Sequence, residues 1–230
     1  MSETEKWAFI KRRFLLSEGS HDKDFLTCLI RARKLPTFQV RHAAECNEKE
    51  VKGRKIRVGG RPGFAPSIEG FPAISGFDRL KGIGLITDND DTNSLRQLIT
   101  SLRRIEGFKP SGDFPVLGTI EGKKVFVVFI PNKGEYGNLE KLCLPALHFL
   151  WPKARACVET YLDCVGAKDW GKKNEIYKAE TRCIISGFNE KDAYKGLGQI
   201  CQNKEFPMDL PCFDELAKTL SFFDEIIAGK

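Results

Sequence analysis

Four carboxylates in two short segments are the residues of this chain best suited to chemistry. A hydrophobic run leads to Glu18, with Asp22 close behind it, and a second hydrophobic run leads to Asp88 and Asp90. A carboxylate just past a buried strand lies at the edge of the sheet where α/β proteins bind their ligands. Carboxylates gathered at one edge need a counter-charge, because they cannot all ionise at close range. A divalent cation with oxygen ligands is the usual counter-charge, so the two segments predict a site for Mg²⁺ or Mn²⁺.

The residues around these carboxylates fit the same hypothesis. Gly19 lets the chain turn close to a ligand, because it has no Cβ. Asp22 falls in the first turn of the following helix, near the positive end of the helix dipole. Asp88 and Asp90 would lie on one side of a turn. A structural alternative stays open, because Asp22 and Asp91 are also well placed to cap the helices behind them.

The pattern of hydrophobic residues predicts the elements that position these segments. We expect strands over residues 12–17, 37–41, 83–87, 114–120 and 124–130, and helices over 20–33, 92–106, 139–150, 154–165, 174–186, 192–201 and 212–227. The alternation of strands and helices up to residue 130 is typical of an α/β fold with a mostly parallel, Rossmann-like sheet and helices on both faces. We therefore expect an α/β core over residues 1–150, with an insertion at about 43–80, and a helical C-terminal extension over 151–230 packed on that core.

Length and composition narrow the class of protein. The 230 residues suit one large domain, or one domain with an appendage, and they carry a net charge of +6. No apolar run is long enough for a transmembrane helix, and the polar N-terminus is unlike a secretory signal, so we expect a cytoplasmic protein that makes no membrane contact. The eight cysteines contain no Cys-x-x-Cys pair, which favours reduced core cysteines over a zinc site.

A basic, glycine-rich stretch lies inside the predicted insertion. Its cations are Lys52, Arg54, Lys55, Arg57 and Arg61. Because cations that follow a phosphate backbone supply most of the non-specific affinity for nucleic acid, the stretch could track DNA or RNA. A solvated loop is an equally good interpretation, since the mild positive charge of the chain permits a polyanionic partner without requiring one.

The two acidic segments resemble the TOPRIM family, in which one hydrophobic strand ends in Glu-Gly and a later one ends in Asp-x-Asp. Here the motifs stand as Leu15-Leu16-Ser17-Glu18-Gly19 and Gly84-Leu85-Ile86-Thr87-Asp88-Asn89-Asp90, and the resemblance covers residues 12–150. Asp22, and Glu140 in Gly137-Asn138-Leu139-Glu140, are similar to the OLD-type nuclease branch and to small stand-alone TOPRIM proteins. The helical extension, with Lys178 in Tyr177-Lys178-Ala179, is also similar to those proteins.

The resemblance implies a TOPRIM fold and metal-dependent chemistry on phosphodiesters. The metal ligands that it implies are Glu18, Asp88 and Asp90 for one ion, with Asp22 and Glu140 helping to hold a second. Lys178 would offset negative charge on the phosphate in the transition state. The sequence lacks the large extra domains of topoisomerases and the zinc ribbon of primases. A Mg²⁺- or Mn²⁺-dependent nuclease acting on DNA or RNA is therefore the function that remains.

The sequence departs from the OLD-type pattern in one respect. OLD-type proteins carry an ATPase on the same chain, whereas this sequence contains no Walker loop. A separate regulatory protein such as an ATPase is therefore a partner to consider, and a role as a defence or toxin effector extends the same hypothesis. Gly196-Leu197-Gly198 is too short for a dinucleotide fingerprint. His21 lies within the first acidic segment, where we expect a local hydrogen-bond partner rather than a phosphate.

Two other functions stay open. Asp88, Asp90 and Thr92 also fit the Asp-x-Asp-x-Thr motif of haloacid dehalogenase phosphatases, in which the first Asp is a nucleophile and the second an acid or base. The mid-chain position of this motif argues against that function, as does the lack of a role for Glu18 and Asp22. A non-catalytic TOPRIM module that binds nucleic acid or assembles with a partner is the other alternative, and metal binding without turnover would support it.

Overall fold

A six-stranded sheet forms the centre of the computed structural model, which describes residues 7–47, 49–51, 54–56, 58–90, 93–171, 173–191 and 193–229. The strands follow the spatial order β2-β1-β5-β8-β7-β6. Their bounds are Arg13–Ser17 (β1), Gln39–His42 (β2), Gly82–Asp88 (β5), Lys109–Pro110 (β6), Val116–Ile120 (β7) and Lys123–Ile130 (β8). The four strands β2, β1, β5 and β8 are parallel to one another. Strand β7 runs antiparallel to β8, and β6 runs antiparallel to β7. A separate hairpin, β3 (Lys49–Val51) with β4 (Arg54–Ile56), lies in the insertion.

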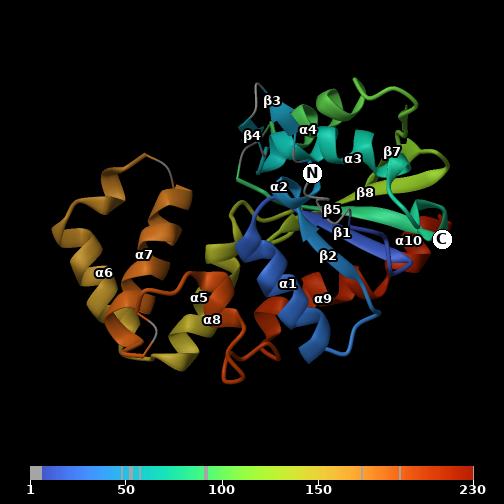
Figure 1. The fold of residues 1–230 in the computed structure, drawn as a ribbon. Helices are drawn as coiled ribbons and strands as arrows, with labels where there is room; N and C mark the ends of the chain where they lie inside the picture. Colours follow the sequence, from blue (N-terminus) through green and yellow to red (C-terminus); the bar gives the residue numbers. More distant parts are fainter. Residues whose placement is uncertain are drawn as a thin grey trace.

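Helices cover both faces of this sheet, as the alternation of elements predicts (Figure 1). Their bounds are Ser20–Ala32 (α1), Ala43–Cys46 (α2), Phe64–Gly70 (α3), Ser94–Leu102 (α4), Leu139–Leu150 (α5), Ala154–Cys164 (α6), Lys173–Phe188 (α7), Leu197–Cys201 (α8), Asp214–Ser221 (α9) and Phe223–Ala228 (α10). The α/β class with a mostly parallel sheet is therefore confirmed. None of the described helices is long and apolar enough to cross a membrane.

The alternation of side chains along the strands divides the core into two clusters. On β1, Phe14 and Leu16 point to one face and Leu15 to the other, because successive side chains of a strand alternate. One cluster lies against α3 and α4. The other lies against α1, α5, α9 and α10. Both faces of the central strands are buried, as the continuous apolar runs of β5 and β8 predict.

The helical extension divides into two parts. Helix α7 packs against α5 and α6 packs against α7, and Figure 1 shows these two helices projecting beyond the sheet. The last two helices return to the sheet, where Phe223 is fully buried with its ring centroid 5.0 Å from those of Phe38 and Phe126. Buried residues of α6 and α7, such as Val158 and Ile184, belong to the same hydrophobic cluster as one face of the sheet.

Two predicted helices differ from those observed. The helix expected over 212–227 is interrupted at Phe222, where the chain changes direction so that Phe223 can enter the core. The helix expected over 192–201 begins only at Leu197, because Gly196 before it is extended and lies against the ring of His21. The short edge strand β6 and the β3–β4 hairpin were not predicted from the sequence.

Candidate functional site

The two acidic segments meet at one edge of the sheet. Strands β1 and β5 are parallel neighbours, and Ser17 pairs in register with Ile86. Glu18, which follows β1, and Asp88, the last residue of β5, therefore lie at the same edge of the sheet. Helix α1 begins at the same edge, with Asp22 in its first turn. The sheet topology thus brings the predicted carboxylates together from two distant stretches of sequence.

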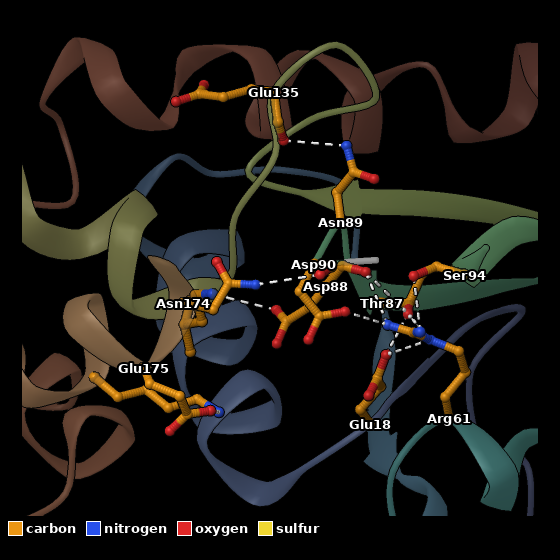
Figure 2. A network of polar contacts seen from close by, with 12 residues as sticks. Glu18, Arg61, Thr87, Asp88, Asn89, Asp90, Ser94, Glu135, Asn174 and Glu175 are labelled. Atoms are coloured by element: carbon orange, nitrogen blue, oxygen red, sulfur yellow. Dashed lines mark hydrogen bonds and ion pairs between the residues drawn. The ribbon is translucent and has the colours of Figure 1, made fainter. Parts of the chain in front are cut away.

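Arg61 lies inside this group of carboxylates (Figure 2). Its guanidinium forms an ion pair of 3.2 Å with Glu18 and one of 2.9 Å with Asp90. It also donates hydrogen bonds to the hydroxyl groups of Thr87 (3.0 Å) and Ser94 (2.8 Å) and to the carbonyl oxygen of Asp88 (3.0 Å). A single arginine therefore connects the ends of β1 and β5 with the start of α4.

The role predicted for Arg61 changes with this geometry. We expected it to belong to an exposed basic stretch that tracks nucleic acid, but its side chain is only 15% exposed and faces carboxylates. Burial lowers its pKa, but the hydrogen bonds and charges of Asp90 and Glu18 outweigh that effect, and the pKa of Arg61 lies above its ordinary value. Of the other cations in the stretch, Lys52 and Arg57 lie outside the described residues, as do the side chains of Arg54 and Lys55.

Glu18 has a second partner besides Arg61. The hydroxyl group of Thr87 donates a short hydrogen bond to the Glu18 carboxylate. Thr87 is 2% exposed and is the last fully buried residue of β5 before Asp88. The carboxylate of Glu18 is therefore held from two sides, by a neighbouring strand and by the insertion. The sequence gives no signal for this role of Thr87, because a threonine in a buried strand shows no local sign of its partner.

Asp22 and Asp88 each accept a hydrogen bond at the beginning of a helix. Asp22 accepts from the N–H of Gly19 (2.9 Å), at the start of α1, as the capping alternative predicts. Asp88 accepts from the N–H of Leu139 (3.2 Å), at the start of α5. Donors at a helix N-terminus favour a negative charge. The predicted cap Asp91 lies outside the described residues.

The side chain of Asn89 explains how α5 comes to meet Asp88. Its amide nitrogen donates to the carbonyl oxygens of Asn132 (3.0 Å), Lys133 (3.1 Å) and Glu135 (3.1 Å), and Figure 2 shows the last of these bonds. These bonds tie the loop after β8 to the end of β5. The middle residue of the Asp-x-Asp motif thereby positions the start of α5, which carries Glu140 in its first turn.

Burial and mutual repulsion disfavour the charged forms of two of these carboxylates. Burial, more than any neighbouring charge, raises the pKa of Asp22 to about 7, with the charges of Glu18 and Glu140 adding to it and the Gly19 N–H opposing it. Burial also raises the pKa of Asp88 well above its ordinary value, followed by the charges of Asp22, Glu18, Glu140 and Asp90. Groups with strongly shifted pKa values beside other titratable groups are typical of functional sites.

The carboxylates do not surround a common point. Among the described residues, no three Asp, Glu, His or Cys side chains converge closely enough to hold a metal ion. The contacts above give the reason, since Arg61 lies between Glu18 and Asp90 while Asp22 and Asp88 face helix N-termini. The chemistry of the donor set nevertheless suits Mg²⁺ or Mn²⁺, because all five acids supply the oxygen ligands that these ions prefer. No ion pair with another described residue reaches Asp22, Asp88 or Glu140.

Lys178 on α7 lies within electrostatic reach of the acids. It forms an exposed ion pair of 3.2 Å with Glu175. Burial lowers its pKa, but Glu175 and, behind it, the charges of Glu140 and Asp88 outweigh burial and raise the pKa above its ordinary value. The structure therefore brings Lys178 near the site without a direct contact to the carboxylates.

Asn174 is a site residue that the sequence analysis missed. It is 7% exposed, and its amide nitrogen donates a long hydrogen bond of 3.4 Å to the carbonyl oxygen of Asp90. Its side-chain oxygen is buried and has no hydrogen-bond partner in the described part of the chain. Figure 2 shows the side chain beside Asp88 and Asp90. A lone asparagine in a helical pattern gives no sequence signal for such a position.

Comparison with known proteins identifies a family without assigning an activity. A family model described as "Protein of unknown function (DUF3226)" matches residues 12–221, which include every element from β1 to α9. No curated protein matches the chain, and no solved structure matches it.

Proposed function

The chain belongs to the DUF3226 family, and we propose that it is a metal-dependent nuclease, which uses Mg²⁺ or Mn²⁺ to hydrolyse phosphodiester bonds in DNA or RNA. The observation that carries the proposal is the meeting of five acids, Glu18, Asp22, Asp88, Asp90 and Glu140, around the ends of β1 and β5. Burial is the main cause of the raised pKa values of Asp22 and Asp88, and the charges of the neighbouring acids add to it, which supports a site where a cation would be favourable. A site with unmet negative charge and oxygen donors favours a divalent cation.

We also propose that the sheet is TOPRIM-like. The parallel order β2-β1-β5-β8 supports this assignment, with the Glu-Gly motif after β1 and the Asp-x-Asp motif after the neighbouring β5. The crevice beyond the carboxyl ends of parallel strands is the usual place for a ligand in an open α/β sheet.

The five acids would bind two different ions. Glu18, Asp88 and Asp90 would hold one ion, and Asp22 and Glu140 would help to hold a second. A bound ion supplies a Lewis acid for a phosphoryl oxygen and lowers the pKa of a coordinated water. The raised pKa of Asp22 means that this carboxylate must release a proton before it acts as a ligand.

Arg61 and Lys178 supply positive charge at different places. Arg61 neutralises Glu18 and Asp90 in the metal-free protein, so it must release them, at least in part, before they can bind an ion. The side chain of Lys178 is partly exposed, and the charges of Glu140 and Asp88 help to raise its pKa. A cation in that position would stabilise the charge that develops on a phosphate bound to the acids.

A cleavage assay tests the proposal. Purified protein with Mg²⁺ or Mn²⁺ should cut single- or double-stranded DNA or RNA, and Glu18→Gln and Asp88→Asn should each abolish cutting while the fold is retained. Glu159→Gln is the matched control, because Glu159 is an exposed acid paired with Arg155 on α6. Metal-dependent cutting that persists in both site variants would refute the assignment.

One observation favours the non-catalytic module as the second candidate. Arg61 already joins Glu18 and Asp90, and the described acids do not converge on a ready metal-binding set. If the arginine is never displaced, the site is structural. Nucleic-acid binding by a protein that neither cuts nor binds Mn²⁺ would establish this alternative. A phosphatase using Asp88 as its nucleophile gains no support, because it leaves Glu18 and Asp22, at the same edge of the sheet, without a role.

A further inference from the structure

A cavity of about 510 Å³ adjoins the acidic site on the side of α7. Its lining includes His21, Glu140, Lys178, Thr181, Arg182 and Tyr194. Glu140 belongs both to this lining and to the acidic group, since its charge raises the pKa values of Asp22 and Asp88. The volume lies in the range of pockets that enclose small molecules or single building blocks of a polymer, roughly 300–1,000 Å³.

Two glycines allow the loop before α8 and the first residues of α8 to pack closely against the start of α1 beside this cavity. A Cβ on Gly196 would lie 2.5 Å from Nε2 of His21, and a Cβ on Gly198 would lie 2.7 Å from its Cα. Such distances do not occur between non-bonded atoms of a packed protein, so only glycine permits the loop before α8 to lie against the start of α1. The Gly196-Leu197-Gly198 segment is thus explained by close packing rather than by dinucleotide binding.

Thr181 belongs to the lining of this cavity, and its buried hydroxyl group lies on α7 between the cavity and the packed interior. The side chain is 2% exposed, and its hydroxyl group has no hydrogen-bond partner in the described part of the chain. Buried hydroxyl groups are almost always hydrogen-bonded, so an unpaired one in a residue that lines a cavity indicates a missing partner, such as a ligand reached by a rotation of the side chain. The hydroxyl group can both donate and accept, as a bond to a phosphate or sugar oxygen would require.

The charges of the cavity suit a phosphate. Lys178 and Arg182 are four residues apart on α7 and therefore lie on the same side of the helix, next to Thr181. Both side chains line the cavity. Arginine and lysine are the usual partners of phosphate oxygens. The cations lie on the α7 wall while the acids lie beyond Glu140, so a polyanion passing through the cavity would lead to the acidic site.

Tyr194 adds an aromatic surface for a base. Its side chain lines the cavity and is 84% exposed, which is unusual for a large aromatic residue. Bases stack on such rings in proteins that bind single strands, and the stacking tolerates any sequence. In a duplex the bases are stacked inside and cannot reach the ring.

We propose that this cavity binds one nucleotide of a single-stranded nucleic acid beside the bond that is cut, with its phosphate on Lys178, Thr181 and Arg182 and its base on Tyr194. The proposal rests on the proposed nuclease function, since it identifies single strands as the substrate of that site. It assigns Arg182 and Tyr194 to binding and places neither among the groups that perform the chemistry.

Binding measurements without catalysis test the proposal. Fluorescence anisotropy of short labelled single-stranded DNA and RNA is measured in the presence of a chelator, so that no cutting occurs. The variants Arg182→Ala and Tyr194→Ala should each weaken binding by about tenfold. Thr181→Val should weaken binding without loss of thermal stability, because the hydroxyl group that it removes has no partner. Arg104→Ala and Tyr161→Ala are matched controls, because these exposed side chains do not line the cavity, and they should bind as the wild type does.

Each other outcome counts against a definite part of the proposal. Unchanged binding by the three cavity variants, or no binding by the wild type, would overturn it. Equal affinity for a duplex would remove the preference for single strands, and equal competition by a nucleoside monophosphate would show that the ligand is a free nucleotide. Binding that depends on the cavity in a protein that never cuts would count against the nuclease function alone.

Discussion

The Nη2 atom of Arg61 lies 2.9 Å from the Oδ1 atom of Asp90, and the two residues are 29 positions apart in the chain. The ion pair lies where the strand carrying the Asp-x-Asp motif ends. It supplies, from inside the protein, part of the positive charge that a metal ion would otherwise bring. If a metal ion binds as we propose, the metal-free and metal-bound proteins would differ in which cation faces Asp90.

Removal of Arg61 should destabilise the metal-free protein and increase its dependence on metal. Arg61→Ala leaves Glu18 and Asp90 without their partner, at a cost of about 1–3 kcal/mol of unfolding free energy, because half-buried carboxylates then repel one another. Mn²⁺ should raise the melting temperature of the variant more than that of the wild type. Differential scanning fluorimetry with a chelator and with Mn²⁺ measures both effects.

Arg104→Ala is the control for this substitution, because it removes an exposed arginine outside the site. Its melting temperature should change little in either condition. A variant at Arg61 with the stability and the Mn²⁺ response of the wild type would show that the arginine and the metal do not compete.

The stability of the protein should depend on pH through Asp22. Its pKa is about 7 in the folded state and near 3.8 in the unfolded chain, so the folded state holds an extra proton between these values. The unfolding free energy therefore falls as the pH rises from about 4 to about 7, and Asp22 then opposes folding. With a chelator present, Asp22→Asn should raise the unfolding free energy at about pH 8, by a few kcal/mol at most. It should have little effect at about pH 4.

Urea denaturation at several pH values measures this difference between Asp22→Asn and the wild type. Asp209→Asn, at an exposed aspartate, is the control and should give no pH-dependent difference. A difference for Asp22→Asn that stays constant from about pH 4 to about pH 8 would contradict the raised pKa of Asp22.

Phe223 should be essential for stability although it lies close to the C-terminus. Phe223→Ala removes a fully buried ring that contacts Phe38 and Phe126, which costs about 3–5 kcal/mol in a packed core. The neighbouring Phe222 is 40% exposed, so Phe222→Ala should cost about 1 kcal/mol or less. Chemical denaturation of both variants tests this contrast, and equal losses would show that α10 does not anchor the extension.

The eight cysteines should react with a thiol reagent in two groups. All eight are free, and only Cys157 and Cys164 are exposed. Burial raises the pKa of Cys46 to about 12 and that of Cys212 to about 11, which slows reaction because the thiolate is the nucleophile. We expect two fast thiols in the folded protein and eight after denaturation. Six or more fast thiols under native conditions would contradict the packing of the helical extension.

The hydrophobic pattern was sufficient to predict the central strands and the acids at their ends. The apolar runs before Glu18 and Asp88 could form only buried strands, and a buried strand places the next polar residue at the edge of the sheet. Helix α5 was also predicted with its observed bounds, Leu139–Leu150. These predictions succeed because burial and backbone periodicity are recorded in consecutive residues.

Only the tertiary structure decided which side chains meet those acids. Arg61 reaches Glu18 across 43 residues and Thr87 across 26, and the loop that carries it shows no periodicity that would indicate its direction. Three other features also depend on how separate elements pack. They are the hydrogen bonds from Asn89 to the loop after β8, the unpaired hydroxyl group of Thr181 and the contact of Gly196 with His21. A local pattern specifies whether a residue is buried, whereas the identity of its partner depends on the path of the whole chain.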